Sequence, residues 1–135
     1  MDIDVSKLAY TFSSKPLLIG GRAMEYYGLR KSGADIDFVI SSEDHNRLAE
    51  IYPNNIKDLY GDIGICEFEF EIWNRIATFN YDYLKEGAIE EEEYLVVSLE
   101  KLLFLKALAM KVPKYLKDLE LVVERILKNA YNTEI

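Results

Sequence analysis

The stretch that decides the fold is "LIGGRAMEYYGLRKSGADIDFVI", which runs from Leu18 to Ile40. Its first apolar run stops at two glycines, and its last one carries two aspartates, Asp35 and Asp37, one residue apart. Side chains alternate along a strand, so both aspartates project from one face, about 7 Å apart. Two acids on an otherwise apolar strand need a partner that favours negative charge.

The glycines suggest a second half of the same site. Gly20 and Gly21 end a predicted strand over residues 16–20 and precede a predicted helix over residues 22–29. Glycine allows close approach of the backbone to a ligand, and a helix N-terminus offers unpaired amides. We therefore expect Gly20 and Gly21 to hold a phosphate, with Arg22 able to reach a triphosphate. The alternatives are a tight turn without a ligand and an arginine solvated at the surface.

The two aspartates indicate a metal site. A shared divalent cation relieves the repulsion between Asp35 and Asp37, and carboxylate oxygens favour Mg²⁺ or Mn²⁺. A third acid on an adjacent strand would complete a two-metal site for displacement at phosphorus. The alternative is that both aspartates lie on the solvated face of an edge strand.

The segment "GICEFEFEIW", residues 64–73, can supply the third acid. Its alternation predicts one strand with Phe68, Phe70 and Ile72 facing inward and the glutamates facing outward. Either Glu69 or Glu71 suits the role, because each lies between apolar residues; with Glu69 the metal ligands are Asp35, Asp37 and Glu69. The remaining glutamates are then the wet face of a hairpin.

The rest of the chain predicts an α+β domain with a small mixed sheet, helices on one side of it and two C-terminal helices. We expect one domain over residues 1–135, with a core over about 17–97 and helices over about 98–130. His45 is expected at the surface. The other predicted elements are a helix over 41–52, strands over 55–60 and 94–97, a short helix within 79–89, and helices opening at Ser98 and Pro113.

Composition narrows the possible functions. The chain has 135 residues, half of them hydrophobic, which suits one globular domain with its own core. A net charge of −8 argues against sequence-blind nucleic-acid binding, which needs a surplus of Lys and Arg. A single cysteine, no apolar run of membrane-spanning length and no leader-like start predict a cytoplasmic protein with no membrane contact.

The order of these motifs resembles the nucleotidyltransferase superfamily related to polymerase beta. The family pattern of a Gly-Gly turn, an acid-x-acid strand and a later acid strand is matched by "LIGG", "ADIDFVI" and "FEFEI". The tail "SLEKLLFLKALAMKVPKYLKDLELV" is similar to the C-terminal helices of the small prokaryotic branch that contains minimal nucleotidyltransferases and abortive-infection toxins. The resemblance covers about residues 17 to 125. It implies that Lys106, Lys114 and Asp118 face the nucleotide; a snorkelling lysine and a Lys114–Asp118 helix pair are the structural alternatives.

The resemblance also implies a reaction. An NTP bound through Mg²⁺ or Mn²⁺ would transfer its NMP to a hydroxyl and release pyrophosphate, with Asp35, Asp37 and Glu69 or Glu71 as catalytic acids. The acceptor could be a tRNA end, a protein hydroxyl or a small molecule. A helical partner protein, as in toxin–antitoxin modules, or a homodimer is expected. The alternative is a catalytically degenerate nucleotidyltransferase fold that binds a nucleotide or a partner. Arg22 favours this alternative, because many active members of the family carry a small polar residue at that position.

Overall fold

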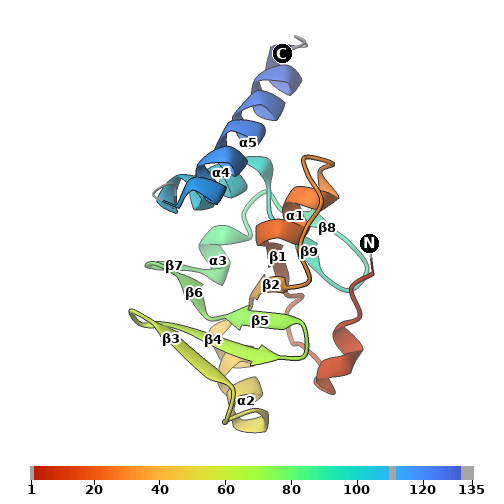
Figure 1. The fold of residues 1–135 in the computed structure, drawn as a ribbon. Coiled ribbons are helices and arrows are strands. Elements are labelled where there is room, and N and C mark those ends of the chain that lie inside the picture. Colours follow the sequence, from red (N-terminus) through yellow and green to blue (C-terminus); the bar gives the residue numbers. More distant parts are fainter. Residues whose placement is uncertain (1, 110–111, 132–135) are drawn as a thin grey trace.

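The structure, a computed structural model, describes residues 2–109 and 112–131. It is built from one seven-stranded sheet, a small two-stranded sheet and helices (Figure 1). The elements are η1 (Val5–Leu8), β1 (Leu17–Ile19), α1 (Gly20–Tyr26), β2 (Ile36–Val39), α2 (Ser42–Ile51), β3 (Ile56–Leu59), β4 (Asp62–Glu67), β5 (Phe70–Trp73), β6 (Arg75–Ile76), β7 (Phe79–Asn80), α3 (Tyr81–Leu84), β8 (Ile89–Glu90), β9 (Leu95–Val96), α4 (Leu99–Leu108) and α5 (Pro113–Tyr131).

The large sheet is mixed, as the sequence predicted, and the α+β class is confirmed. Its strand order is β3-β4-β5-β2-β1-β9-β8. Strand β2 pairs in parallel with β5 and antiparallel with β1, and β1 pairs in parallel with β9. The strands that carry the predicted acids are therefore direct neighbours at the centre of the sheet.

The predicted ten-residue strand over 64–73 is wrong. The segment forms the antiparallel strands β4 and β5, which turn at Phe68 and Glu69. Phe68 has a φ of +53° and is 62% exposed, so it does not face the core. The alternation of Phe and Glu continues through the turn without a glycine or proline, and this concealed the hairpin.

The core lies against the central strands. Leu18, Phe38, Ile72 and Val96, from four different strands, are fully buried. The rings of Phe38 and Phe70 stack with their centroids 5.9 Å apart across the β2–β5 pair. Burial on this scale, at about 25 cal/mol per Å² of apolar surface, is what fixes the register of the strands.

Helices α2 and α4 begin where the sequence placed their caps, whereas α1 begins at Gly20, two residues before the predicted start. Ser41 accepts a hydrogen bond from the Asp44 amide at the start of α2, and Ser98 accepts one from the Lys101 amide at the start of α4. Helices α4 and α5 pack together at one end of the molecule, and the C-terminal part of α5 extends beyond it (Figure 1). Among the described residues, no helix combines the length and apolar composition that crossing a membrane requires.

The expectation that His45 lies at the surface is wrong. Its ring is 5% exposed, and Nε2 lies 2.9 Å from the Ile63 carbonyl oxygen. The neighbouring Asp44 is fully buried and accepts hydrogen bonds from the Tyr10 hydroxyl, the Ser13 amide and hydroxyl and the Ser14 amide. These bonds attach the N-terminal segment to α2.

Candidate functional site

A cavity of about 400 Å³ opens between the centre of the sheet and the pair α4–α5. Its lining combines charged and apolar side chains. It is lined by Ile19, Gly20, Asp37, Lys57, Leu59, Asp62, Glu71, Trp73, Ile76, Leu102, Leu105, Lys106, Ala109 and Tyr115. Its size is within the range of small-ligand sites, about 300–1,000 Å³.

Two of the carboxyl groups that line the cavity come from neighbouring strands. Asp37 on β2 is directly opposite Glu71 on β5 in the parallel register, so both side chains project from the same face. Burial raises the pKa of Asp37 to about 7, and a hydrogen bond to Glu71 and the negative charge of that residue add to the rise. Two neighbouring carboxyl groups repel each other when both are ionised, and a divalent cation would relieve that repulsion.

Gly20 shapes the turn beside these acids. Its φ is +68°, and a Cβ atom at this position would lie 2.7 Å from Oδ2 of Asp37. Only glycine therefore lets β1 turn into α1 at this distance from the carboxyl group. The turn and the acid pair are parts of one site.

Trp73 closes the floor of the cavity, two residues after Glu71 on the same face of β5. A hydrogen bond from Trp73 opposes the rise in the pKa of Asp37. Its ring lies against Gly64, where a Cβ atom would come within 2.9 Å of the indole. The glycine thus provides the space in which the indole lies beside the acid pair.

Lys57 reaches the same acids from the edge strand β3. Its Nζ lies 3.1 Å from Oε1 of Glu71. The sequence reasoning did not identify Lys57, and a lone lysine in the predicted strand over 55–60 gives no signal of its own. The strand register brings Lys57 to the acids: Lys57 pairs with Gly64 on β4, and β4 pairs with β5, which carries Glu71.

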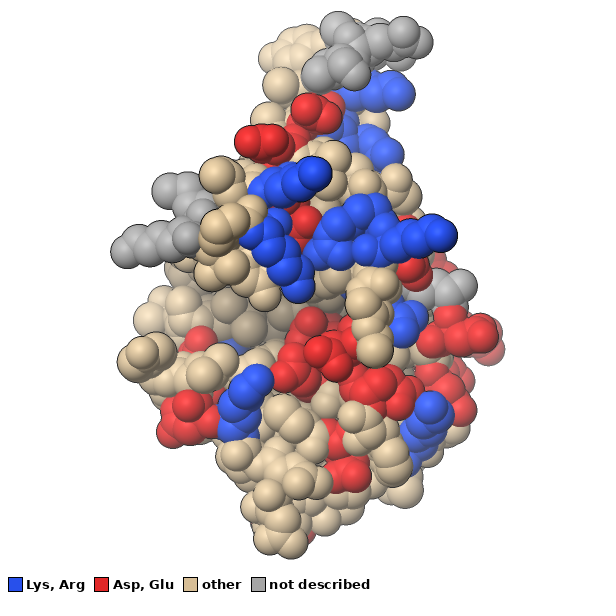
Figure 2. Space-filling model, in the orientation of Figure 1, with Lys and Arg blue, Asp and Glu red and all other residues tan. Residues whose placement is uncertain are grey.

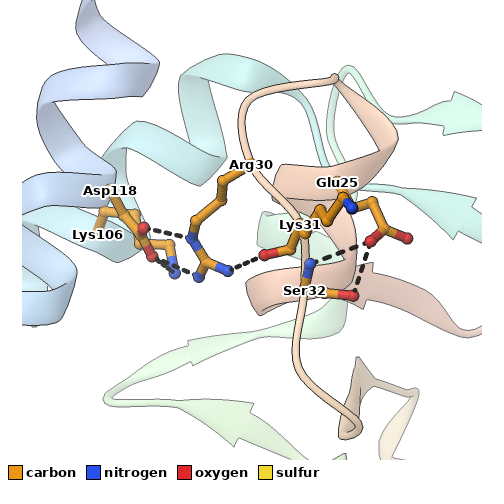
Figure 3. Close-up of polar contacts among 6 residues, drawn as sticks. All are labelled: Glu25, Arg30, Lys31, Ser32, Lys106 and Asp118. Atoms are coloured by element: carbon orange, nitrogen blue, oxygen red, sulfur yellow. Dashed lines mark hydrogen bonds and ion pairs between the residues drawn. The ribbon is translucent and has the colours of Figure 1, made fainter.

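A buried charge cluster joins the helices to the loop after α1 (Figure 3). Asp118 on α5 is 2% exposed and accepts hydrogen bonds from Nε and Nη2 of Arg30, at 2.6 Å and 2.8 Å. Lys106 on α4 is 4% exposed, and its Nζ lies 2.9 Å from Oδ2 of Asp118. Burial lowers the pKa of Lys106 even though Asp118 opposes the fall. Burial would raise the pKa of Asp118, but Arg30 and Lys106 hold it below its ordinary value.

The structure brings only some of the predicted site residues to the cavity. Gly20, Asp37, Glu71 and Lys106 line it. Asp118 is paired with Lys106. Gly21 lies beside Arg30: a Cβ atom at Gly21 would be 3.6 Å from Nη1 of the guanidinium.

The other predicted site residues lie outside the cavity lining. Asp35 is exposed just before β2. Glu69 is in the turn before β5, where its Oε1 is 2.9 Å from Nζ of Lys7. Arg22 is partly buried, and its Nε has no hydrogen-bond partner among the residues that the structure describes. Lys114 is exposed beside the Tyr115 ring, and Asp118 pairs with Arg30 and Lys106 instead.

The expected three-acid metal set is not gathered in the structure. Over residues 2–109 and 112–131, no three His, Cys, Asp or Glu side chains form a group that could hold a metal ion. Mg²⁺, however, is commonly bound through one or two carboxylates together with the phosphates of a substrate. Asp37 and Glu71 fit that pattern, because they lie on the same face of adjacent strands and line the same cavity.

Charge is distributed unevenly around the site. Figure 2 shows Lys and Arg side chains gathered over the end formed by α4 and α5, and Asp and Glu side chains gathered directly below them. Within the cavity itself, Lys106 lines the helical side, and Asp37, Asp62 and Glu71 line the sheet side together with Lys57. This suits a ligand that carries its own negative charge together with a bound cation.

Comparisons with known proteins do not assign the chain to a family: no family model, no curated protein and no solved structure matches it.

Proposed function

We propose that the protein is a metal-dependent nucleotidyltransferase that transfers an NMP from an NTP to a hydroxyl acceptor. The observation that carries this proposal is the Asp37–Glu71 pair, two carboxyl groups in register on adjacent strands beside the Gly20 turn. The pattern agrees with the motif resemblance, in which a Gly-Gly turn is followed by two acid strands.

Cationic side chains of the cavity would bind the phosphates. Lys106 enters from α4 above the acid pair and is held by Asp118, 2.9 Å away. The backbone at Gly20 can approach a phosphate because no Cβ stands in the way. Together they orient the triphosphate with its α phosphorus toward Asp37 and Glu71.

The two acids would then have two tasks, which are to bind the cation and to accept a proton. A bound Mg²⁺ or Mn²⁺ would neutralise the phosphate charge that develops as pyrophosphate departs. A carboxyl group that binds the cation stays ionised, so whichever of Asp37 and Glu71 is not bound to the cation would accept the proton of the attacking hydroxyl.

The apolar side chains of the cavity suit the base of the nucleotide. Leu59 and Ile76 on the sheet side and Leu105 on α4 offer hydrocarbon surface to a flat ring. The acceptor in this proposal is a tRNA end, a protein hydroxyl or a small molecule. A helical partner or a second copy of the chain would complete its binding surface, in the cytoplasm.

One observation favours a second candidate, a catalytically degenerate fold that binds a nucleotide without turnover. Asp35 and Glu69 do not line the cavity, so two carboxyl groups stand where the motif supplies three. Substrate phosphates would then complete the shell of a single cation, and chemistry would depend on whether one cation is enough.

The test is calorimetric titration of ATP, CTP, GTP and UTP in Mg²⁺, with the wild type, Asp37→Asn and Glu69→Gln. We expect binding that needs Mg²⁺, falls at least tenfold in Asp37→Asn and persists in Glu69→Gln, whose side chain lies outside the cavity. Release of pyrophosphate from the bound NTP would separate the enzyme from the degenerate fold. Absence of binding by the wild type to all four nucleotides would refute both candidates.

A further inference from the structure

The Lys57–Glu71 ion pair lies at the cation site of the proposed function. Nζ of Lys57 is 3.1 Å from Oε1 of Glu71, and Glu71 is in register with Asp37 on the neighbouring strand. The lysine therefore neutralises one member of the acid pair. It does so from β3, across β4, the strand that lies between β3 and β5.

The solvent exposure of Lys57 and Glu71 allows each of them to change its partner. The Lys57 side chain is 49% exposed and that of Glu71 is 25% exposed, so water can solvate either group when they separate. Half-exposed ion pairs of this kind contribute about 0–1 kcal/mol to stability. Breaking the pair therefore costs little free energy, unlike breaking the buried Lys106–Asp118 pair.

We propose that Lys57 is an exchangeable counter-ion: it neutralises Glu71 in the cation-free protein, and it moves to a phosphate of the nucleotide when a divalent cation binds the acid pair. The inference rests on the proposed function. A bound cation repels the ammonium group and takes over its carboxylate. A triphosphate in the same cavity supplies the new partner, because Lys57 lines the cavity together with Gly20, Asp37 and Lys106.

Lys57 and Lys106, which both line the cavity, would then have different roles. Lys106 is 4% exposed and fixed by Asp118, so it is a permanent phosphate contact. Lys57 has a flexible, half-exposed side chain and changes partner with the state of the site. Cation and nucleotide would thus bind cooperatively, because each removes an obstacle to the other.

The test is a pair of titrations on Lys57→Met. Removal of the competing ammonium group should tighten Mn²⁺ binding by the nucleotide-free protein about threefold to tenfold, since a weak ion pair no longer has to be broken. Loss of a phosphate partner should weaken NTP binding at saturating Mg²⁺ by about tenfold. A purely structural role of Lys57 would not strengthen Mn²⁺ binding while it weakens NTP binding. Lys57→Arg, which keeps the charge, should restore NTP binding.

Lys7→Met is the matched control. Lys7 pairs with Glu69 at 2.9 Å, and their side chains are 49% and 29% exposed, almost as in the Lys57 pair, but neither residue lines the cavity. This variant should leave both affinities at the wild-type value. Equal Mn²⁺ affinities of Lys57→Met and Lys7→Met, or undiminished NTP binding by Lys57→Met, would overturn the inference alone. A wild type that binds neither Mn²⁺ nor NTP would overturn the proposed function and the inference with it.

Discussion

At the scale of single residues, Asp37 is the group whose chemistry is most altered by the fold. An unfolded chain ionises this carboxyl near its ordinary value of 3.8, whereas the folded protein holds its pKa at about 7 because of burial and Glu71. Between these values the folded state binds more protons than the unfolded state. Its contribution to stability is therefore lost as pH rises from about 4 to 7.

Replacing Asp37 by Asn should remove this loss. At pH 8 with a chelator present, we expect Asp37→Asn to be more stable than the wild type by about 2 kcal/mol, because no charge is then buried beside Glu71. The gain should shrink toward pH 5. Urea unfolding at both pH values measures it, with Asp82→Asn as the control, since the Asp82 side chain is 82% exposed. An equal gain at both pH values would contradict the expected titration.

Asp44 should behave in the opposite sense. Burial works against its ionisation, yet the hydrogen bonds from Tyr10, Ser13 and Ser14 hold its pKa below the ordinary value. Its contribution is thus present above about pH 4 and is lost as pH falls further. Asp44→Ala leaves several donors without an acceptor and should cost about 3 kcal/mol at pH 7.

Thermal and urea unfolding of Asp44→Ala and Ser13→Ala would measure this effect. Ser13→Ala removes one hydroxyl donor and leaves the carboxylate in place, so it should cost about 1 kcal/mol. Equal losses for both variants would show that the carboxylate is not the centre of this cluster.

At the scale of elements, the attachment of α4 and α5 depends on the cluster of Arg30, Lys106 and Asp118. Asp118→Ala would leave the buried Lys106 ammonium unpaired, so we expect a loss of about 3–5 kcal/mol. The double variant Lys106→Met/Asp118→Leu removes both buried charges and should recover much of that stability. It should nevertheless bind NTP poorly, because the Lys106 phosphate contact is gone.

Unfolding and nucleotide titration of the same two variants separate packing from binding. Arg30 remains in both, with a side chain that is 25% exposed and can be solvated. Full NTP affinity in the double variant would refute the role of Lys106.

The type of an element was predictable from the sequence where the hydrophobic periodicity agrees with the residues that begin or end helices and strands. The Gly20 turn, the Ser41 and Ser98 caps and Pro113 at the first position of α5 all fall where local chemistry places them. The β4–β5 turn was not predictable, because Phe68 takes a positive φ in a run that alternates without a break. Such a turn is selected by the pairing of the flanking strands.

The candidate site was predictable in part for the same reason. Gly20 and Asp37 are signalled by local motifs, and the choice between Glu69 and Glu71 required the parallel register of β2 and β5. Lys57 and Arg30 reach their partners across 14 and 88 residues of chain. Nothing in their local sequence records those contacts.

At the scale of the whole molecule, the proposed function puts the phosphates of a nucleotide beside the charged side chains of the cavity and its base beside the apolar ones. The phosphates would meet Lys57, Lys106 and the acid pair, and the base would meet Leu59, Ile76 and Leu105. Asp62, an acidic group at this wall, already accepts hydrogen bonds from Arg75 and the Ala77 amide. The base should therefore be held by contact area more than by hydrogen bonds.

We accordingly expect weak selection among bases. ATP, CTP, GTP and UTP should bind with dissociation constants within about tenfold of one another, since a site reads a polar edge strongly only through buried hydrogen-bonding groups. Leu59→Ala should weaken all four together, because Leu59 lines the cavity and is 46% exposed, and the change removes apolar contact from the base. A preference of a hundredfold or more for one base would contradict this view of the cavity.

The register of β2 against β5 also limits how this protein can vary over evolutionary time. Asp37 and Glu71 meet because two strands pair at fixed positions, Ile36 with Phe70 and Val39 with Trp73. A one-residue insertion inside either strand would turn its acid to the opposite face, while insertions in the surrounding loops would leave the pair facing each other. Descendant sequences should therefore gain and lose residues freely around these two short strands and keep their length constant.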